Sequence, residues 1–291
     1  MILKKKKIRN DIKSFLRLYA KRPIKDNSGG ILFGHAFALH YFLKKLKPKL
    51  IVESGTFKGQ SSWLMKQTCP NSKIVTLDIY PNKLEYKNKK IKYLYKDFTL
   101  YDWSKIPKNS LIFFDDHQNA LERIIYAKWA GFKYVIFEDN DEDQVDFYTI
   151  RQVLSGKGFQ NNIYSFKKNY LRYFYLRIFH FFKSELKKVL ITKVKFFDKT
   201  IKNHYYKHNI FEYKDIKKNF HDRNILLTNI LKYIEFPSMI KEKNFKSKSK
   251  NILKNNYLFK NLDEALKFDK NFRSIKKELS YYNNIVLIVL K

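Results

Sequence analysis

The sequence predicts an α/β protein with a doubly wound, mainly parallel sheet covered by helices on both faces. Between residues 50 and 137, short apolar runs alternate with helical stretches, which is typical of parallel strands joined by right-handed crossovers. Such short apolar runs are typical of a parallel sheet that is covered on both faces. The run 284–290 is the most strand-like of the chain, and we expect it to join the same sheet.

The expected elements follow from apolar runs and from the turn residues between them. Strands are expected at 50–53, 73–77, 91–96, 110–114, 134–137 and 284–290. Helices are expected at 9–20, 31–47, 61–68 and 120–130. Pro48 stops the second of these helices and Gly131 closes the last, because proline cannot continue a helix and glycine favours its end.

The chain divides into three parts by composition. Residues 1–30 form a basic helical extension, residues 31–159 with 281–291 form the sheet domain, and residues 160–280 form a long, basic, aromatic-rich insertion before the last strand. A separate second domain is the alternative for the insertion. Within it, Tyr170 to Phe182 is almost all apolar or aromatic, with basic residues between, which is typical of a buried helix or of a helix on an anionic membrane surface.

The chain is strongly basic. Its 291 residues contain 60 Lys and Arg against 27 Asp and Glu, a formal net charge of +33. Only nine of the basic residues are Arg, and an AT-rich coding sequence would produce the same excess of Lys. Nucleic-acid recognition relies on bidentate Arg contacts, so this composition disfavours a nucleic-acid partner while still allowing polyanions to bind.

Cysteine content and hydropathy favour a cytoplasmic protein. Cys69 is the only cysteine, so no internal disulfide forms and a reducing compartment is expected. The uncharged stretch 31–43 is shorter than the ~20 residues that cross a bilayer. The basic start of the chain is not followed by the apolar region of a signal peptide.

A glycine-containing loop follows the first predicted strand, where parallel sheets bind ligands. It reads Glu53-Ser54-Gly55-Thr56-Phe57-Lys58-Gly59-Gln60-Ser61. Gly55 and Gly59 let the backbone turn tightly and approach a ligand. The loop lacks the Gly-Lys-Ser/Thr of a phosphate-binding P-loop and the third glycine of a dinucleotide fingerprint. Alone, it also fits a structural turn.

Acidic residues end the second and third predicted strands. Asp78 comes 25 residues after Glu53, where an acid accepts the hydroxyls of a ribose in this class of sheet. Asp97 is placed to meet an adenine amino group. Each acid could equally cap a helix or a turn.

These motifs, in this order, resemble class I S-adenosylmethionine-dependent methyltransferases, which are Rossmann-like. The first loop is similar to that of the catechol O-methyltransferase-like and cephalosporin hydroxylase-like enzymes, over residues 45–155. The resemblance implies that S-adenosylmethionine is held through its methionine part, its ribose and its adenine. The implied cofactor-binding residues are Glu53, Gly55, Thr56, Gly59, Ser61, Asp78, Asp97 and Asp115.

The fourth and fifth predicted strands each end in a polar cluster. These are Asp115-Asp116-His117 and Glu138-Asp139-Asn140, and neighbouring parallel strands would bring them into one crevice. Concentrated carboxylates repel one another unless they share a proton or a cation, and oxygen ligands suit Mg²⁺. A solvated acidic rim without metal is the alternative.

The resemblance implies a metal site and a departure from the catechol mechanism. The implied metal ligands are Asp116, Asp139 and Asn140, with Glu138 as a substitute. Asn119 stands where the catechol-type enzymes carry a lysine base, so His117 becomes the candidate base beside Asp116 as the catalytic pair.

The sequence therefore predicts a methyltransferase that modifies an oxygen of a small molecule or glycan precursor, with its specificity set by the insertion. The alternative is a non-catalytic methyltransferase-like protein whose basic C-terminal half docks on nucleic acid or on an anionic membrane surface. Methylation of nucleic-acid bases is disfavoured, because Asp115-Asp116-His117 replaces the Asn/Asp-Pro-Pro-aromatic loop of those enzymes.

Overall fold

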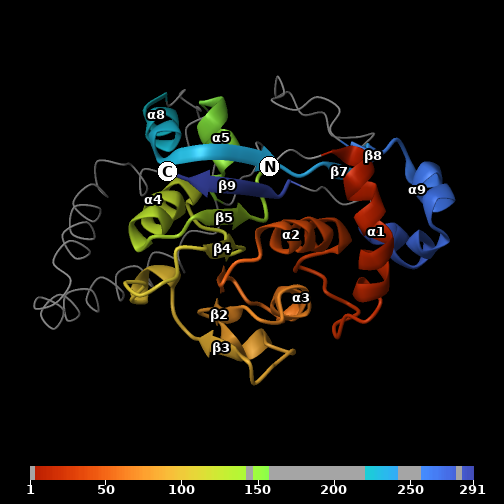
Figure 1. The fold of residues 1–291 in the computed structure, drawn as a ribbon, viewed down its shortest axis with the longest axis horizontal. Helices are drawn as coiled ribbons and strands as arrows, with labels where there is room; N and C mark the ends of the chain where they lie inside the picture. Colours follow the sequence, from red (N-terminus) through yellow and green to blue (C-terminus); the bar gives the residue numbers. More distant parts are fainter. Residues whose placement is uncertain (1–3, 142–146, 157–219, 242–256, 280–283) are drawn as a thin grey trace, which may run out of the picture.

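A seven-stranded sheet forms the centre of the molecule (Figure 1). The computed structural model describes residues 4–141, 147–156, 220–241, 257–279 and 284–291. The strand order is β3-β2-β1-β4-β5-β9-β6. β9 runs antiparallel to both β5 and β6, and all the other neighbouring strands are parallel. The strands are β1 (Leu50–Ser54), β2 (Lys73–Leu77), β3 (Ile91–Leu94), β4 (Ser110–Phe114), β5 (Tyr134–Phe137), β6 (Ile230–Glu235) and β9 (Val286–Leu290).

Helices cover both faces of this sheet. α2 and α3 pack on one face and α4, α5 and α8 on the other. The described α-helices are α1 (Lys5–Tyr19), α2 (Phe33–Leu46), α3 (Gln60–Thr68), α4 (Ala120–Ala130), α5 (Ile150–Ser155), α8 (Phe220–Asn229), α9 (Leu262–Phe268) and α10 (Lys276–Leu279). A two-stranded sheet pairs β7 (Ser238–Ile240) with β8 (Tyr257–Phe259). None of the described helices is both long enough and apolar enough to span a membrane.

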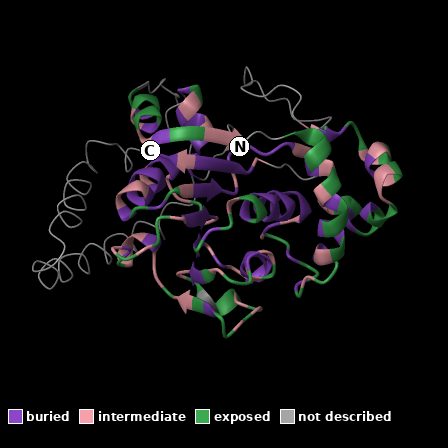
Figure 2. Ribbon diagram, in the orientation of Figure 1, coloured by how far each residue is buried: buried purple, intermediate pink, exposed green. Residues whose placement is uncertain are grey.

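Alternate side chains of the central strands enter two separate cores. Ile51 and Leu111 pack with α1, α2 and α3, whereas Val52 and Ile112 pack with α4, α5 and α8. This explains why the strands read as continuous apolar runs. Figure 2 shows the same strands and α2 as almost wholly buried. The predicted α/β class, the mainly parallel sheet and the pairing of the C-terminal strand with it are confirmed.

The segment 160–280 is not wholly an insertion. Its strand β6 is the edge of the main sheet and pairs with β9, and its helix α8 packs against α4 and α5. Strand β6 was not predicted, because an edge strand is half solvated and its residues Leu231 and Lys232 are exposed. Residues 157–219, with the aromatic run 170–182, and residues 242–256 lie outside the described residues.

The N-terminal helix α1 is built into the molecule, although residues 1–30 were predicted to form an extension. Its face of Ile8, Ile12 and Phe15 is fully buried. The Phe15 ring packs against Phe33 of α2 at 5.3 Å between ring centroids. Because α2 is enclosed by the sheet, α1, α3 and the C-terminal segment, its residues 33–43 are all buried.

Candidate active site

The glycine loop holds three strands together at their carboxyl ends. The Gly55 amide donates to the Leu77 carbonyl at 2.9 Å, and the Asp115 amide donates to the Ser54 carbonyl at 2.8 Å. Gly55 has a φ of +98°, and a Cβ there would lie 2.0 Å from the Asp115 carbonyl oxygen. Gly59 has a φ of +92° and begins α3. Both glycines are therefore required by backbone geometry.

Glu53 ends β1 as a fully buried carboxyl group. Burial raises the pKa of Glu53 to about 7, although hydrogen bonds from Ser61 and Ser62 oppose that rise. Its Oε1 atom has no hydrogen-bond partner among the described residues, and neither has the buried side-chain amide of Gln60. Buried polar atoms normally find partners, so these atoms mark a place for a polar ligand.

Asp78 ends β2 and fixes the same loop. Its carboxylate accepts hydrogen bonds from the amides of Phe57 and Tyr80, each at 2.7 Å. The Thr56 side chain is buried and donates to Thr76 at 2.8 Å. Asp78 thus follows β2 beside the glycine loop, whose Phe57 amide positions its carboxylate, and the Thr56 hydroxyl is engaged within the protein.

Asp97 is part of a buried ion pair. Both of its oxygens bond to Arg123, at 3.1 and 2.6 Å, and it also accepts from Thr99. Burial alone would raise the pKa of Asp97, but the Arg123 guanidinium outweighs it and holds that pKa well below its usual value. The carboxylate is therefore engaged within the protein, and its predicted contact with adenine remains a prediction.

The same guanidinium reaches Asp116. The Arg123 Nη2 atom lies 2.9 Å from Asp116 Oδ2, which also accepts from Ser54 at 2.6 Å. Burial raises the pKa of Asp116 even though Arg123 opposes it. The Asp116 carboxylate is thus engaged by Arg123 and Ser54, and its role as a metal ligand stays a prediction.

His117 lies over the acids at the ends of β4 and β5. Its Nε2 atom is 3.4 Å from Asp139 and 3.9 Å from Asp115, and its ring stacks on Phe147 with 4.8 Å between centroids. Burial would lower the pKa of His117, but Asp139 and Asp115 raise it to about 9. A raised pKa favours the protonated ring, so the role of His117 as a base stays a prediction.

Asp115 completes this carboxylate group. Its pKa is raised well above the usual value by burial and by the charges of Glu138 and Asp139. The structure therefore brings Asp115, Glu138 and Asp139 together as predicted. They line a small pocket of about 10 Å³ between the ends of β4 and β5, with Phe137, Phe147 and Thr149 also in its wall.

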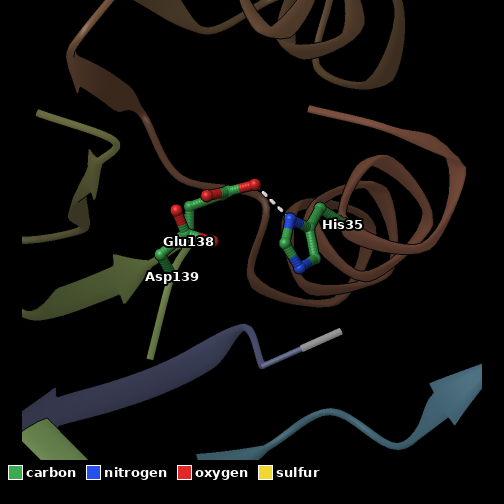
Figure 3. Close-up of side chains that lie close together, drawn as sticks. All are labelled: His35, Glu138 and Asp139. Atoms are coloured by element: carbon green, nitrogen blue, oxygen red, sulfur yellow. Dashed lines mark hydrogen bonds and ion pairs between the residues drawn. The ribbon is translucent and has the colours of Figure 1, made fainter. Parts of the chain in front are cut away.

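His35, Glu138 and Asp139 form a candidate metal centre (Figure 3). One ligand atom from each lies within 4.8 Å of the others, and His35 Nδ1 contacts a Glu138 oxygen. Burial and Asp139 raise the pKa of Glu138 well above normal, as expected for crowded carboxylates without a cation. The buried Asp139 Oδ1 has no partner among the described residues. Two oxygens and an imidazole nitrogen fit a divalent cation.

Asn140 does not join this centre. Its side chain donates to the Tyr233 hydroxyl at 2.8 Å and accepts from the Arg151 amide at 2.9 Å, and it is fully buried. Its role as a metal ligand stays a prediction, and Glu138, the predicted substitute, is the residue that lies with His35 and Asp139. His35 was not singled out from the sequence. The only available signal was a histidine within the apolar first half of α2, and a buried core histidine gives the same signal.

Comparison with known proteins finds similarity between this chain and solved structures. No family model matches the chain, and no curated protein matches it. The chain is similar to solved methyltransferases. It matches CmcI with SAH at 18% identity, covering 41% of this chain and 68% of CmcI, with a TM-score of 0.35.

Two O-methyltransferases match to a comparable extent. TomG from Streptomyces achromogenes, in complex with SAM, is 14% identical over 48% of this chain and 68% of TomG, with a TM-score of 0.34. The O-methyltransferase from Bacillus cereus, in complex with SAH, is 18% identical over 46% of this chain and 66% of that enzyme, with a TM-score of 0.31. About a third of each of these chains has no counterpart here.

Proposed function

We propose that this chain is an S-adenosylmethionine-dependent O-methyltransferase acting on a small molecule or glycan precursor. The observation that carries the proposal is the buried Glu53 carboxyl, with an unpartnered oxygen beside the unpartnered Gln60 amide, behind the glycine loop. Support also comes from the strand order, with its antiparallel β9, which is typical of Rossmann-like methyltransferases.

Glu53 and Gln60 are suited to the amino-acid end of the cofactor. An ionised Glu53 would pair with its ammonium group, and the Gln60 amide supplies both a donor and an acceptor. Asp78, held by the Phe57 and Tyr80 amides, is the proposed ribose acceptor. When bound, S-adenosylmethionine supplies an electrophilic methyl group, so this chain mainly orients the acceptor oxygen and excludes water.

The acceptor is proposed to enter at the ends of β4 and β5. There the His117 ring, stacked on Phe147, can donate a hydrogen bond to an acceptor. Asp115 lies 3.9 Å from His117 and has a raised pKa, so it is the carboxylate that we propose takes the proton of the acceptor.

We infer further that His35, Glu138 and Asp139 would hold a divalent cation. The bound cation would lower the pKa of an acceptor hydroxyl. Mg²⁺ is the ion predicted from the carboxylates, but the imidazole in this set suits Mn²⁺, Fe²⁺ or Zn²⁺ as well, because these ions accept nitrogen ligands more readily.

The Glu53→Gln variant tests the cofactor site. We expect its affinity for S-adenosylhomocysteine to fall by about 10-fold to 100-fold, since a charge-assisted hydrogen bond of about 1.5–3 kcal/mol is lost. Because the pKa of Glu53 is about 7, binding to the wild type should strengthen from pH 6 to pH 8 as the carboxylate ionises. This rise should be absent in E53Q. Isothermal titration calorimetry measures both.

Glu235→Gln is the matched control, since Glu235 is also a buried glutamate at a strand end but pairs with Arg151 at 2.8 Å. It should lower the melting temperature and leave the affinity for S-adenosylhomocysteine unchanged. E53Q should not be destabilised above pH 7, because burying an ionised Glu53 disfavours folding there. Equal affinities of E53Q and the wild type at pH 8 would contradict the proposed role of Glu53.

Metal binding is tested with His35→Asn. We expect saturating Mn²⁺ to raise the melting temperature of the wild type, and H35N to bind Mn²⁺ about 10-fold to 100-fold more weakly, as for other disrupted metal sites. His40→Asn is the control, because His40 lies on the same helix and contacts Thr68 at 2.8 Å instead of the acids. The Mn²⁺ electron paramagnetic resonance signal gives the affinity. A wild type whose melting temperature responds to none of Mn²⁺, Mg²⁺, Fe²⁺ and Zn²⁺ would rule out this centre.

A further inference from the structure

A second concave site lies between α1 and the segment that carries β8 and α9. It has a volume of about 500 Å³, within the range of small-molecule pockets. Lys5 and Lys6 lie on the α1 wall, and Tyr257, Lys260 and Phe268 lie on the opposite wall. None of these residues belongs to the candidate active site. Figure 1 shows α1, β8 and α9 together at one side of the molecule.

Arg9 holds the two walls of this groove together. Its Nε donates to the Leu258 carbonyl at 2.9 Å, and its Nη2 pairs with Glu264 at 2.5 Å. The guanidinium also lies over the Phe259 ring, 4.5 Å from its centroid. The groove therefore keeps its shape without a ligand, which lowers the entropy lost on binding.

The charge of the groove is strongly positive. Four cationic side chains line it, from Lys5, Lys6, Arg9 and Lys260, against the single carboxylate of Glu264. Glu264 is already engaged, because it accepts from Arg9 and, at 2.6 Å, from the Lys260 amide. The ammonium groups of Lys6 and Lys260 line the groove as well, and lysine binds phosphate as a point charge.

Aromatic rings lie beside these cations. Lys5 Nζ lies 4.8 Å from the centroid of Tyr257, and Lys13 Nζ lies 5.3 Å from that of Phe268. We propose that the groove binds a phosphate-bearing ligand, with its phosphate between Lys6 and Lys260 and its carbon-rich part against Tyr257. A soluble organic phosphate and a phospholipid headgroup share this chemistry. The proposal does not depend on the cofactor site.

The test compares two double variants that remove the same charge. K6A/K260A removes two exposed groove lysines, and K90A/K108A removes two exposed lysines elsewhere. The soluble probe is uridine diphosphate, which lacks the adenine of the cofactor, with S-adenosylhomocysteine present at saturation. The lipid probe is a vesicle of phosphatidylcholine and phosphatidylglycerol. Titrations are made at about 0.15 M salt, where long-range attraction is screened.

We expect one of the two probes to bind about 10-fold more weakly to K6A/K260A, and its affinity for K90A/K108A to stay within about twofold of the wild type. The probe that responds identifies whether the phosphate is soluble or lipid-borne.

Equal weakening in both variants would show non-specific attraction to a protein of charge +33 and would overturn the proposal. The proposal would also be overturned if K6A/K260A bound both probes as tightly as the wild type, or if neither probe bound to the wild type. E53Q should bind the responding probe normally, so failure here is separable from failure of the cofactor site.

Discussion

Replacing Gly55 with alanine should cost at least about 3 kcal/mol of folding free energy, because the added Cβ overpacks a backbone contact. That Cβ would lie 2.0 Å from the Asp115 carbonyl oxygen and 2.5 Å from its carbon. Both atoms are backbone, so the ends of β1 and β4 would have to separate. Separation would break the bond from the Asp115 amide to Ser54 and would displace the loop that carries the cofactor residues.

Gly131→Ala is a close control for this prediction. Gly131 has a φ of +89°, similar to the +98° of Gly55, but a Cβ at Gly131 would meet nothing nearer than 3.8 Å. G131A should therefore cost about 1 kcal/mol, the strain of a left-handed residue alone. Chemical denaturation gives both values. Equal losses in the two variants would show that the close approach of β1 and β4 is not what requires Gly55.

Arg123→Met should destabilise the protein by about 3–5 kcal/mol, since it leaves buried carboxylates without their partner. Arg123 is only 5% exposed and lies 2.6 Å from Asp97 and 2.9 Å from Asp116. In the wild type, Arg123 lowers the pKa of Asp97, so the pair stabilises the fold above the unfolded pKa of Asp97 and loses that effect in acid. Without Arg123, burial should raise both carboxyl pKa values.

The deficit of R123M should therefore be largest at neutral pH, where Asp97 and Asp116 are ionised, and should shrink toward about pH 4 as they protonate. Arg9→Met is the control, because the Arg9–Glu264 pair is about one-third exposed and should contribute about 1 kcal/mol or less. Urea denaturation at several pH values measures these differences. A loss in R123M no larger than that in R9M would contradict the assignment of a buried, stabilising network.

The sequence predicted the parts of the fold that depend on local patterning. The strands at 50–54, 73–77, 110–114 and 134–137 are buried on both faces, so their apolar runs were visible. Strand β6 was missed because half of it faces solvent. The packing of α1 with residues 257–279 depends on contacts across most of the chain, such as that from Tyr19 to Glu278 at 2.6 Å, which no local pattern encodes.

The location of the candidate site was predicted better than the side-chain contacts of its residues. The acids after β4 and β5 do converge, because parallel strands end at one edge. Their individual roles depend on side chains from helices: Arg123 engages Asp97 and Asp116, and Tyr233 engages Asn140. His35 comes from α2, more than 100 residues away in sequence from Glu138. Spacing within the strands and loops does not report such contacts.

A crystal structure of the protein with S-adenosylhomocysteine is the most direct test of the proposed function. The prediction is that the ligand lies at the carboxyl ends of β1 and β2, with its ammonium group bonded to Glu53 Oε1 and its ribose bonded to Asp78. A ligand bound elsewhere, or no ligand bound at the ends of β1 and β2 at saturating concentration, would contradict the cofactor site.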